Sequence, residues 1–125
     1  MDGDTQALRE VDSYRFLDRL TQKLVQSWIE LEVFRTVSAR ALSRVSRGMP
    51  GPESAILKMF WSEADQRLAR TALEVLGPYG QLLMDDSAPF AHHYLRVRGR
   101  TIEAGTSEVM RNTIATRVLG LPKSF

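Results

Sequence analysis

The sequence predicts an all-α fold, a four-helix and mostly antiparallel bundle, on three observations. Apolar residues recur every three or four positions over two long stretches, which is the period of an amphipathic helix. Clusters of glycine and proline interrupt that pattern, and no stretch sustains the alternation typical of a strand. With 125 residues, 43% of them hydrophobic, the chain is long enough to form a core as one domain.

The first predicted helix runs from Leu17 to a breaker at residues 47–52. At about 1.5 Å per residue, its ~30 residues would span about 45 Å, so we expect it to pack within a bundle. Trp28, beside the apolar seam, is assigned to the core. The seam has nine positions, seven of them apolar: Leu17, Leu20, Leu24, Ser27, Leu31, Phe34, Ser38, Ala41 and Val45.

The second predicted helix follows the breaker. Pro52 suits the first helical position, and Glu53 complements the positive helix start. The sequence Gly77-Pro78-Tyr79-Gly80 ends the helix. Its apolar positions, which also assign Trp61 to the core, are Leu57, Phe60, Trp61, Ala64, Leu68, Ala72 and Val75.

Two shorter helices are predicted after a loop. The loop, residues 81–89, is expected to tuck Leu82, Leu83 and Met84 inward. The third helix runs from about residue 90 to about residue 102 or 103. Thr106 or Ser107 then caps the fourth helix, with Glu108 in its first turn. Its apolar side is formed by Met110, Ile114, Val118 and Leu119, and Gly120 and Pro122 end the pattern.

Composition excludes several classes of protein. The net charge is +2, and 14 of the 17 cations are arginines spread along the chain. This spread is typical of solvated helix faces rather than of a nucleic-acid surface. The lack of cysteine excludes disulfides, cysteine-bound zinc and a cysteine nucleophile. No stretch reaches the ~20 apolar residues of a membrane span, and no secretory signal is found, so we expect a cytoplasmic protein.

The residues with chemical potential lie in the last third of the chain. Gly105-Thr106-Ser107-Glu108 places hydroxyls and backbone N–H groups at a helix start, which suits phosphate oxygens or a polar cofactor edge. An ordinary helix cap has the same composition, so this pattern alone leaves both open. The adjacent His92 and His93 point to different helix faces without a third ligand at metal spacing, which predicts surface histidines and no metal site. Three arginines, Arg96, Arg98 and Arg100, fan around the third helix and are predicted to be solvated.

Three motifs in order carry a resemblance to a known family. The longest runs from Tyr94 to Asn112 (YLRVRGRTIEAGTSEVMRN) and continues through residues 114–115 and 117–122. The others are residues 51–58 with 60–63 (GPESAILK, FWSE) and residues 72–80 (ALEVLGPYG). Together they resemble the C-terminal domain of the acyl-CoA dehydrogenase family, from the first helix to Pro122.

The resemblance implies a flavoenzyme that oxidises an acyl-CoA thioester to the 2,3-enoyl-CoA. FAD accepts a hydride, and an electron-transfer partner reoxidises it. Family members have three domains, and this chain resembles most of the last one only, without the N-terminal and middle domains and without the opening helix of the bundle. We therefore expect no turnover by the chain alone. We also expect a homo- or hetero-oligomer, because the incomplete bundle exposes an apolar groove.

The resemblance also implies which residues bind the cofactor. Thr106, Ser107 and Glu108 would lie against FAD. A second group, Glu74, Gly77 and Pro78, matches the glycine-rich turn that reaches the FAD of a neighbouring protomer. There the family usually has Gln and a second Gly where this chain has Glu74 and Pro78. A carboxylate repels a pyrophosphate and proline lacks a donor, so a helix-end carboxylate and a simple helix stop remain open alternatives at this turn.

The catalytic base of the family has no counterpart at its usual place. Many members carry a Glu immediately before the Gly of the Gly-Thr-Ser motif, where this chain has Ala104. Glu103 is one residue early, which turns a side chain by about 100° on a helix. It is a weak candidate, and a surface carboxylate fits better. The backbone N–H of Ala104, next to Gly105, would help hold the thioester carbonyl, and other branches of the family carry their base on the opening helix.

Two alternatives to a dehydrogenase domain remain. The chain could be a non-catalytic helical oligomerisation module, or an inactive remnant of the family. A free-standing helical regulator without flavin would require the three motifs to be coincidental.

Overall fold

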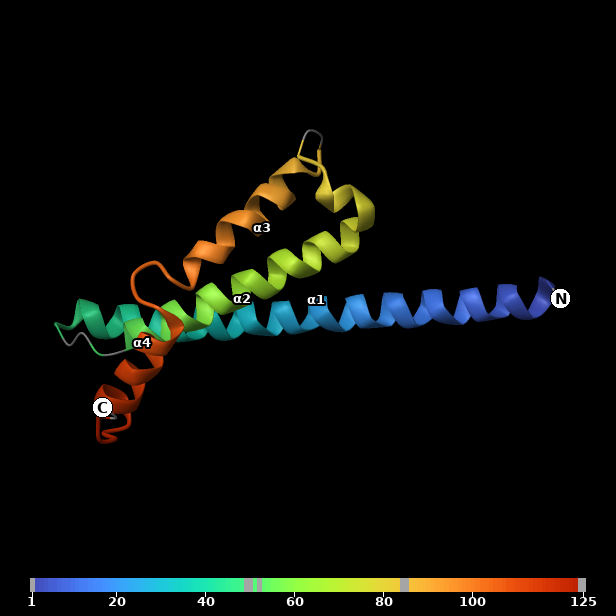
Figure 1. The fold of residues 1–125 in the computed structure, drawn as a ribbon. Coiled ribbons are helices and arrows are strands. Elements are labelled where there is room, and N and C mark those ends of the chain that lie inside the picture. Colours follow the sequence, from blue (N-terminus) through green and yellow to red (C-terminus); the bar gives the residue numbers. More distant parts are fainter. Residues whose placement is uncertain (1, 49–50, 52, 84–85, 124–125) are drawn as a thin grey trace.

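The computed structural model describes residues 2–48, 51, 53–83 and 86–123. It confirms the all-α fold, and the described residues contain no strand. Figure 1 shows the arrangement of the helices. The elements are α1 (Asp2–Ser46), α2 (Glu53–Leu76), a 3₁₀ helix (η1, Gly77–Gln81), α3 (Ala88–Arg100), α4 (Ser107–Thr113) and a π-helical turn (η2, Ile114–Val118).

Helix α2 is the centre of the fold. It packs against α1, α3, α4 and η1, and Figure 1 shows α1 and α3 running antiparallel to it. The residues that α2 buries are small or short, namely Ala55, Ser62, Ala69 and Thr71. Small side chains let neighbouring helices approach closely, so one helix can serve several interfaces.

Helix α1 is longer than the sequence pattern predicted. It starts at Asp2, fifteen positions before Leu17, and its 45 residues correspond to about 68 Å. Figure 1 shows its first turns projecting beyond α2, and residues 6–19 are all exposed. This part consists mainly of charged and helix-compatible residues without proline. No neighbour covers residues 6–19, so none of them is buried. Leu8, Val11, Tyr14 and Leu17 continue the apolar spacing toward the N-terminus, so the predicted start at Leu17 was too late.

The predicted core position of the two tryptophans is wrong. Trp28 is 62% exposed and Trp61 41% exposed, and Leu24 and Leu31 of the predicted seam are also exposed. Helix α1 has one main neighbour, α2, and so buries only a narrow stripe. That stripe contains Leu20, which is buried, and Phe34, which stacks on Phe60 of α2 with ring centroids 6.4 Å apart.

The boundaries of the other elements differ by a few residues from the predictions. Helix α2 begins with the acidic Glu53 as predicted, whereas Pro52 lies outside the described residues. Helix α3 ends at Arg100, two or three residues early. Val118 and Leu119 are exposed rather than on a buried apolar side.

The loop before α3 is also corrected. Leu82 and Leu83 are about half exposed instead of tucked inward, and Met84 lies outside the described residues. The inward-facing residue is Ser87, which is buried and donates to the carbonyl of Tyr79 at 2.7 Å. A hydroxyl that satisfies a loop carbonyl can be buried at low cost.

The described part of the chain holds neither a membrane-spanning helix nor a cluster of metal ligands. No helix there is long and apolar enough to cross a membrane. No group of three or more His, Asp or Glu side chains there is arranged to hold a metal ion.

Candidate functional site

A polar surface concavity of about 410 Å³ lies where α2 meets the turn between α3 and α4. We call it the α2–α4 concavity. It contains the Thr-Ser-Glu motif that the sequence singled out. Its lining residues are Glu63 and Gln66 of α2, Thr101 and Ile102 of the turn, and Thr106, Ser107, Glu108 and Arg111 at α4.

Two side chains of α2 hold the walls of this concavity together. The Gln66 amide donates to the carbonyl of Val97 and to the hydroxyl of Thr101, both at 3.1 Å. Glu63 accepts from the Arg111 guanidinium at 2.9 Å. Because both residues lie on α2, the end of α3 and the start of α4 are fixed relative to the same helix.

The turn before α4 has an unusual backbone. Ala104 has a φ of 54° and Gly105 a φ of 107°, both in the left-handed region that non-glycine residues seldom adopt. The φ of Gly105 therefore favours glycine, because any side chain at this position would be strained. The ammonium of Lys58 on α2 donates to the Gly105 carbonyl and ties the turn to α2.

The predicted helix cap at Thr106 is confirmed. Its hydroxyl accepts from the backbone N–H of Val109 at 3.3 Å. Ser107 is 8% exposed, and its hydroxyl makes no hydrogen bond to the described part of the chain, so it can donate into the concavity. Glu108 is exposed. Its carboxylate accepts hydrogen bonds from the Glu108 backbone N–H and from the Thr106 hydroxyl, and these hydrogen bonds lower the pKa of Glu108.

Glu103 and Ala104 lie on the turn, and both are exposed. Glu103 pairs with Arg96 of α3. The hydrogen bond from Arg96 is the main cause that lowers the pKa of Glu103, and the same contact raises the pKa of Arg96. A general base works best when its pKa is raised toward the working pH. The environment of Glu103 therefore argues against a role as the base and favours a surface ion pair.

Glu74, Gly77 and Pro78 lie at the other end of α2. Glu74 is eleven residues beyond Glu63, or about 16 Å along the helix axis, so the structure does not bring the two predicted cofactor-binding groups together within one chain. Glu74 is not simply solvated, since its carboxylate accepts from Lys23 of α1 at 2.5 Å. Gly77 has a φ of 57° directly after α2, as expected of a helix-ending glycine.

Sequence reasoning missed a polar cluster around Asp65 of α2, whose side chain is only 12% exposed. Its carboxylate pairs with His93 at 2.9 Å and with Arg100. The guanidinium of Arg100 also stacks over the Trp61 ring, 4.6 Å from the centroid. The His93 side chain is 42% exposed, in agreement with the predicted surface position, whereas the prediction that Arg100 is solvated is wrong. The seven-residue spacing of His93 and Arg100, which puts both on one face of a helix, was the available signal.

The comparisons with known proteins agree with these motifs. The sequence model described as "Acyl-CoA dehydrogenase, C-terminal domain" matches residues 18–119. The chain is 30% identical over 105 residues to the acyl-CoA dehydrogenase IpdE1 of Mycobacterium tuberculosis, covering 83% of this chain and 27% of that protein. It is 34% identical to the IpdE1 protein of Mycolicibacterium smegmatis, covering 83% of this chain and 26% of that protein. The chain thus spans about a quarter of the length of these relatives. No solved structure matches significantly.

Proposed function

Since the chain belongs to the acyl-CoA dehydrogenase family through its C-terminal domain, we propose that it supplies the FAD-binding and protomer-contacting helical part of a flavin-dependent acyl-CoA dehydrogenase. The observation that carries this proposal is the α2–α4 concavity. Thr106 and Ser107 of the family's Gly-Thr-Ser motif line it, and Lys58, Gln66 and Glu63 hold its walls on α2.

The donor set of the concavity fits the flavin part of FAD better than its phosphates. The charged residues that line it are Glu63, Glu108 and Arg111, which is a net charge of −1. A negative site disfavours a pyrophosphate, whereas the Ser107 hydroxyl is a neutral donor that suits a polar ring edge. Thr106, Ser107 and Glu108 would hold the cofactor here. When bound, FAD supplies the hydride acceptor for the oxidation of an acyl-CoA thioester.

This chain's own contribution to the chemistry is polarisation and positioning. The backbone N–H of Ala104 makes no hydrogen bond within the described part of the chain, so it is available to the thioester carbonyl, next to Gly105. Donors placed at a developing enolate oxygen lower the barrier. Proton removal also needs a base, and neither the Ala104 methyl nor the paired Glu103 supplies one. We therefore propose that the base comes from the rest of the assembled enzyme and that the chain alone is inactive.

The test is reconstitution. The chain is titrated with FAD, alone and with a partner that holds the N-terminal and middle domains, while flavin absorption and dye-coupled acyl-CoA oxidation are followed. We expect activity only with the partner, and at least tenfold weaker FAD binding in Ser107→Ala, the variant that removes the free donor. Ser43→Ala, which removes an exposed hydroxyl on α1, is the matched control. The proposal would be refuted if the chain bound no FAD, either alone or with the partner.

A second candidate function is a non-catalytic oligomerisation module. It is favoured by a row of exposed apolar side chains along α1, which includes Leu17, Leu24, Trp28, Leu31 and Leu42 at 43–70% exposure. Exposed apolar side chains gathered along one helix mark an interaction surface. Sedimentation at micromolar concentration should show a dimer or larger species, and a monomer there would count against both oligomerisation and protomer contacts.

A further inference from the structure

Helix α1 carries two rows of apolar side chains, and α2 covers only one of them. In the covered row Leu20 is buried and Phe34 stacks on Phe60. The second row, which we call the outer seam, advances in alternating steps of four and three residues, as in a helix that packs along another helix. All of its apolar side chains are exposed, namely Tyr14, Leu17, Leu24, Trp28, Leu31, Leu42 and Val45. Its polar positions are Glu10, Thr21, Arg35 and Ser38.

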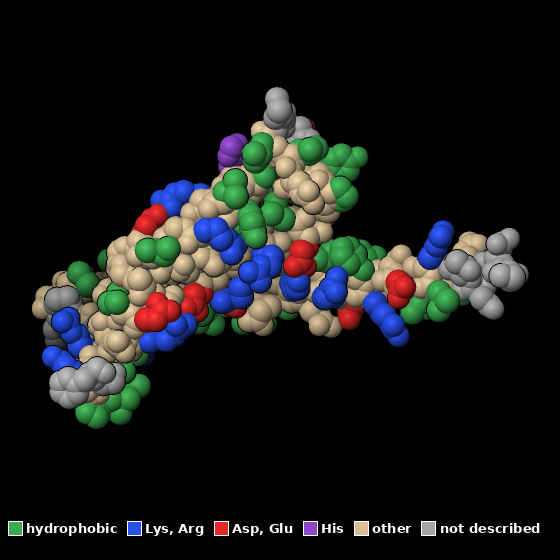
Figure 2. All heavy atoms as spheres, viewed as in Figure 1, with side chains coloured by type: hydrophobic (Ala, Val, Ile, Leu, Met, Phe, Trp, Pro, Cys, Tyr) green, Lys and Arg blue, Asp and Glu red, His purple; other side chains and the backbone are tan. Residues whose placement is uncertain are grey.

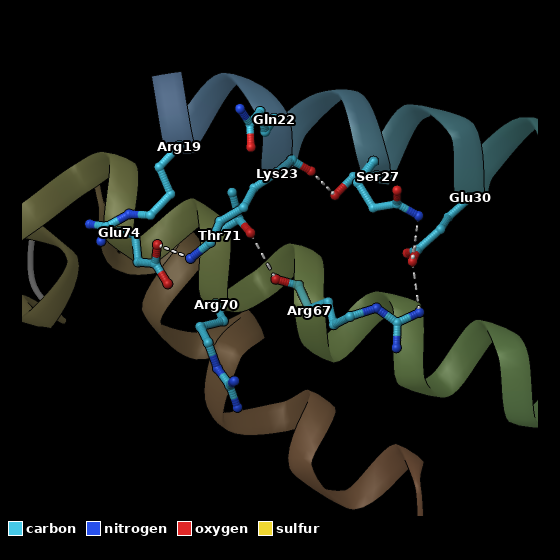
Figure 3. A pocket seen from close by; sticks show the side chains of 10 residues that line it. Arg19, Gln22, Lys23, Ser27, Glu30, Arg67, Arg70, Thr71 and Glu74 are labelled. Carbon is cyan, nitrogen blue, oxygen red and sulfur yellow. Dashed lines mark hydrogen bonds and ion pairs between the residues drawn. The ribbon is translucent and has the colours of Figure 1, made fainter. Parts of the chain in front are cut away.

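The two edges of the junction between α1 and α2 differ in polarity. Figure 2 shows charged side chains gathered along this junction, and Figure 3 shows the ion pairs of its polar edge, Lys23–Glu74 and Arg67–Glu30. The other edge holds an apolar hollow of about 160 Å³, the α1–α2 groove. Its apolar lining is formed by Leu31 and Phe34 of α1 and by Phe60, Trp61, Ala64 and Leu68 of α2. Because Leu31 belongs to both, a partner that packs on the outer seam reaches this groove.

The charges on α1 are unequally distributed along its length. Residues 6–18 contain three carboxylates and two arginines, whereas residues 33–47 contain four arginines and no carboxylate. In the outer seam itself, Glu10 has no cation partner within the described part of the chain. Arg35 contacts only Glu32 on its own helix, at 3.1 Å, and an exposed pair of this kind contributes little. A second α1 in the antiparallel orientation matches the charge at both ends of the seam.

One register satisfies the charged and the apolar positions together. Contacts in a two-fold symmetric pair are reciprocal, so Glu10 against Arg35 of the second copy also places Arg35 against Glu10 of that copy. The positions between them then meet within the seam, as Tyr14 with Leu31, Leu17 with Trp28 and Thr21 with Leu24. A parallel pair would instead bring Glu10 to Glu10 and Arg35 to Arg35, and like charges in contact disfavour association.

From this geometry we propose that a second copy of this chain docks on the outer seam and the α1–α2 groove, with the two α1 helices antiparallel and paired over residues 10–35. The first turns of α1, which project beyond α2 (Figure 1), then lie on the second copy beside its α1–α2 groove. Tyr14 meets Leu31 there, where the apolar lining suits its ring and the carboxylates of Glu30 and Asp65 can accept from its hydroxyl.

The inference rests on the protomer contacts of the proposed function and names the surface that makes them. It does not require FAD, so all of its tests are made on the whole chain without flavin. In sedimentation equilibrium at micromolar concentration, we expect a dimer.

Cross-linking tests the orientation of the two helices. The chain has no cysteine, so Glu10→Cys and Arg35→Cys each introduce a single thiol. Equal positions in the antiparallel pair lie 25 residues apart, or about 38 Å. A short bifunctional thiol reagent should therefore link a mixture of the two variants into a dimer and leave each variant alone unlinked. The control mixture of Asp18→Cys and Arg40→Cys, exposed positions outside the seam, should not link.

Charge reversal tests the register. Glu10→Arg alone or Arg35→Glu alone brings like charges together and should weaken dimerisation at least tenfold. The double variant restores opposite charges and should dimerise within threefold of the unchanged chain. Asp18→Arg, a reversal outside the seam, should change dimerisation less than threefold.

Tyr14→Ala tests the contact with the α1–α2 groove. Tyr14 and Leu8 are both 66% exposed on the projecting part of α1, so neither side chain supports the fold of a single copy. Tyr14→Ala should weaken dimerisation at least tenfold, whereas the matched control Leu8→Ala, which lies outside the seam, should weaken it less than threefold.

Four outcomes would overturn the proposal. The first is a monomer at micromolar concentration, which would leave the outer seam to a helix of another protein and would also remove the protomer contacts from the proposed function. The second is linking of either single-thiol variant with itself, which would indicate a parallel pair. The third is a double charge variant as weak as the single ones, and the fourth is an equal loss in Tyr14→Ala and Leu8→Ala. A dimer with any of the last three results refutes this interface alone, whereas a dimer that passes them but binds no FAD refutes only the flavin part of the proposed function.

Discussion

The contacts around Asp65 allow us to predict how much one substitution lowers the free energy of unfolding. Asp65→Asn keeps the shape of the side chain and removes its charge. The Asp65 side chain is 12% exposed and that of Arg100 is 25% exposed, whereas His93 is 42% exposed. A hydrogen bond to a charged group contributes about 1.5–3 kcal/mol, while the more exposed His93 contact adds close to nothing after solvent screening. Breaking a fully buried ion pair costs about 3–5 kcal/mol. The Asp65–Arg100 pair should cost less, because the Arg100 side chain is partly exposed. We therefore expect a loss of about 2 kcal/mol.

The assay is urea denaturation followed by circular dichroism and tryptophan fluorescence at one protein concentration, since association changes apparent stability. With an m value of about 2 kcal/mol/M, the midpoint should fall by roughly 1 M. Fluorescence of the native state should also change, because Arg100 lies over Trp61. The control is Glu32→Gln, which breaks the exposed Glu32–Arg35 pair and should cost less than about 0.5 kcal/mol. Equal small losses in the two variants would refute the view that this cluster fixes α3 on α2.

Three further predictions concern the turn before α4. Lys58→Met removes the donor to the Gly105 carbonyl and should speed amide exchange in residues 103–106 by at least tenfold while leaving residues 20–40 unchanged; uniform acceleration would instead indicate global destabilisation. Ala104→Gly relieves a φ of 54° and should raise stability by about 0.5–1 kcal/mol in thermal unfolding, whereas Ala39→Gly inside α1 should lower it by about 1 kcal/mol. Because the folded-state pKa of Glu103 is lowered, mainly by Arg96, its contribution to stability is present above the unfolded pKa and is lost as pH falls through the folded pKa. Arg96→Gln should raise the pKa of Glu103 in a carboxyl NMR titration, and an unchanged pKa would show that the pair does not form in solution.

Local sequence signals were sufficient where a structure depends on neighbours along the chain. The period of three and four residues, the glycine and proline breakers and the Thr106 cap predicted the helices, because helix formation and capping involve residues only a few positions apart. The motif containing Ala104 and Gly105 also identified the turn that the structure holds in a left-handed backbone. The family followed from the same motifs, because their residue types and order are specific to it.

What surrounds each helix face was decided only by the tertiary structure. An apolar face looks the same in the sequence whether or not a neighbour covers it, so Trp28 and Leu24 were assigned to the core and are exposed. The charged contacts were hidden for the same reason. Lys23–Glu74, separated by 51 positions, and Arg100–Asp65, separated by 35 positions, become neighbours only when α1 and α3 pack on α2. The sequence by itself determined the helices and their caps, and the packing of these helices on α2 decided which side chains became ion pairs, which lined a groove and which remained open to a partner.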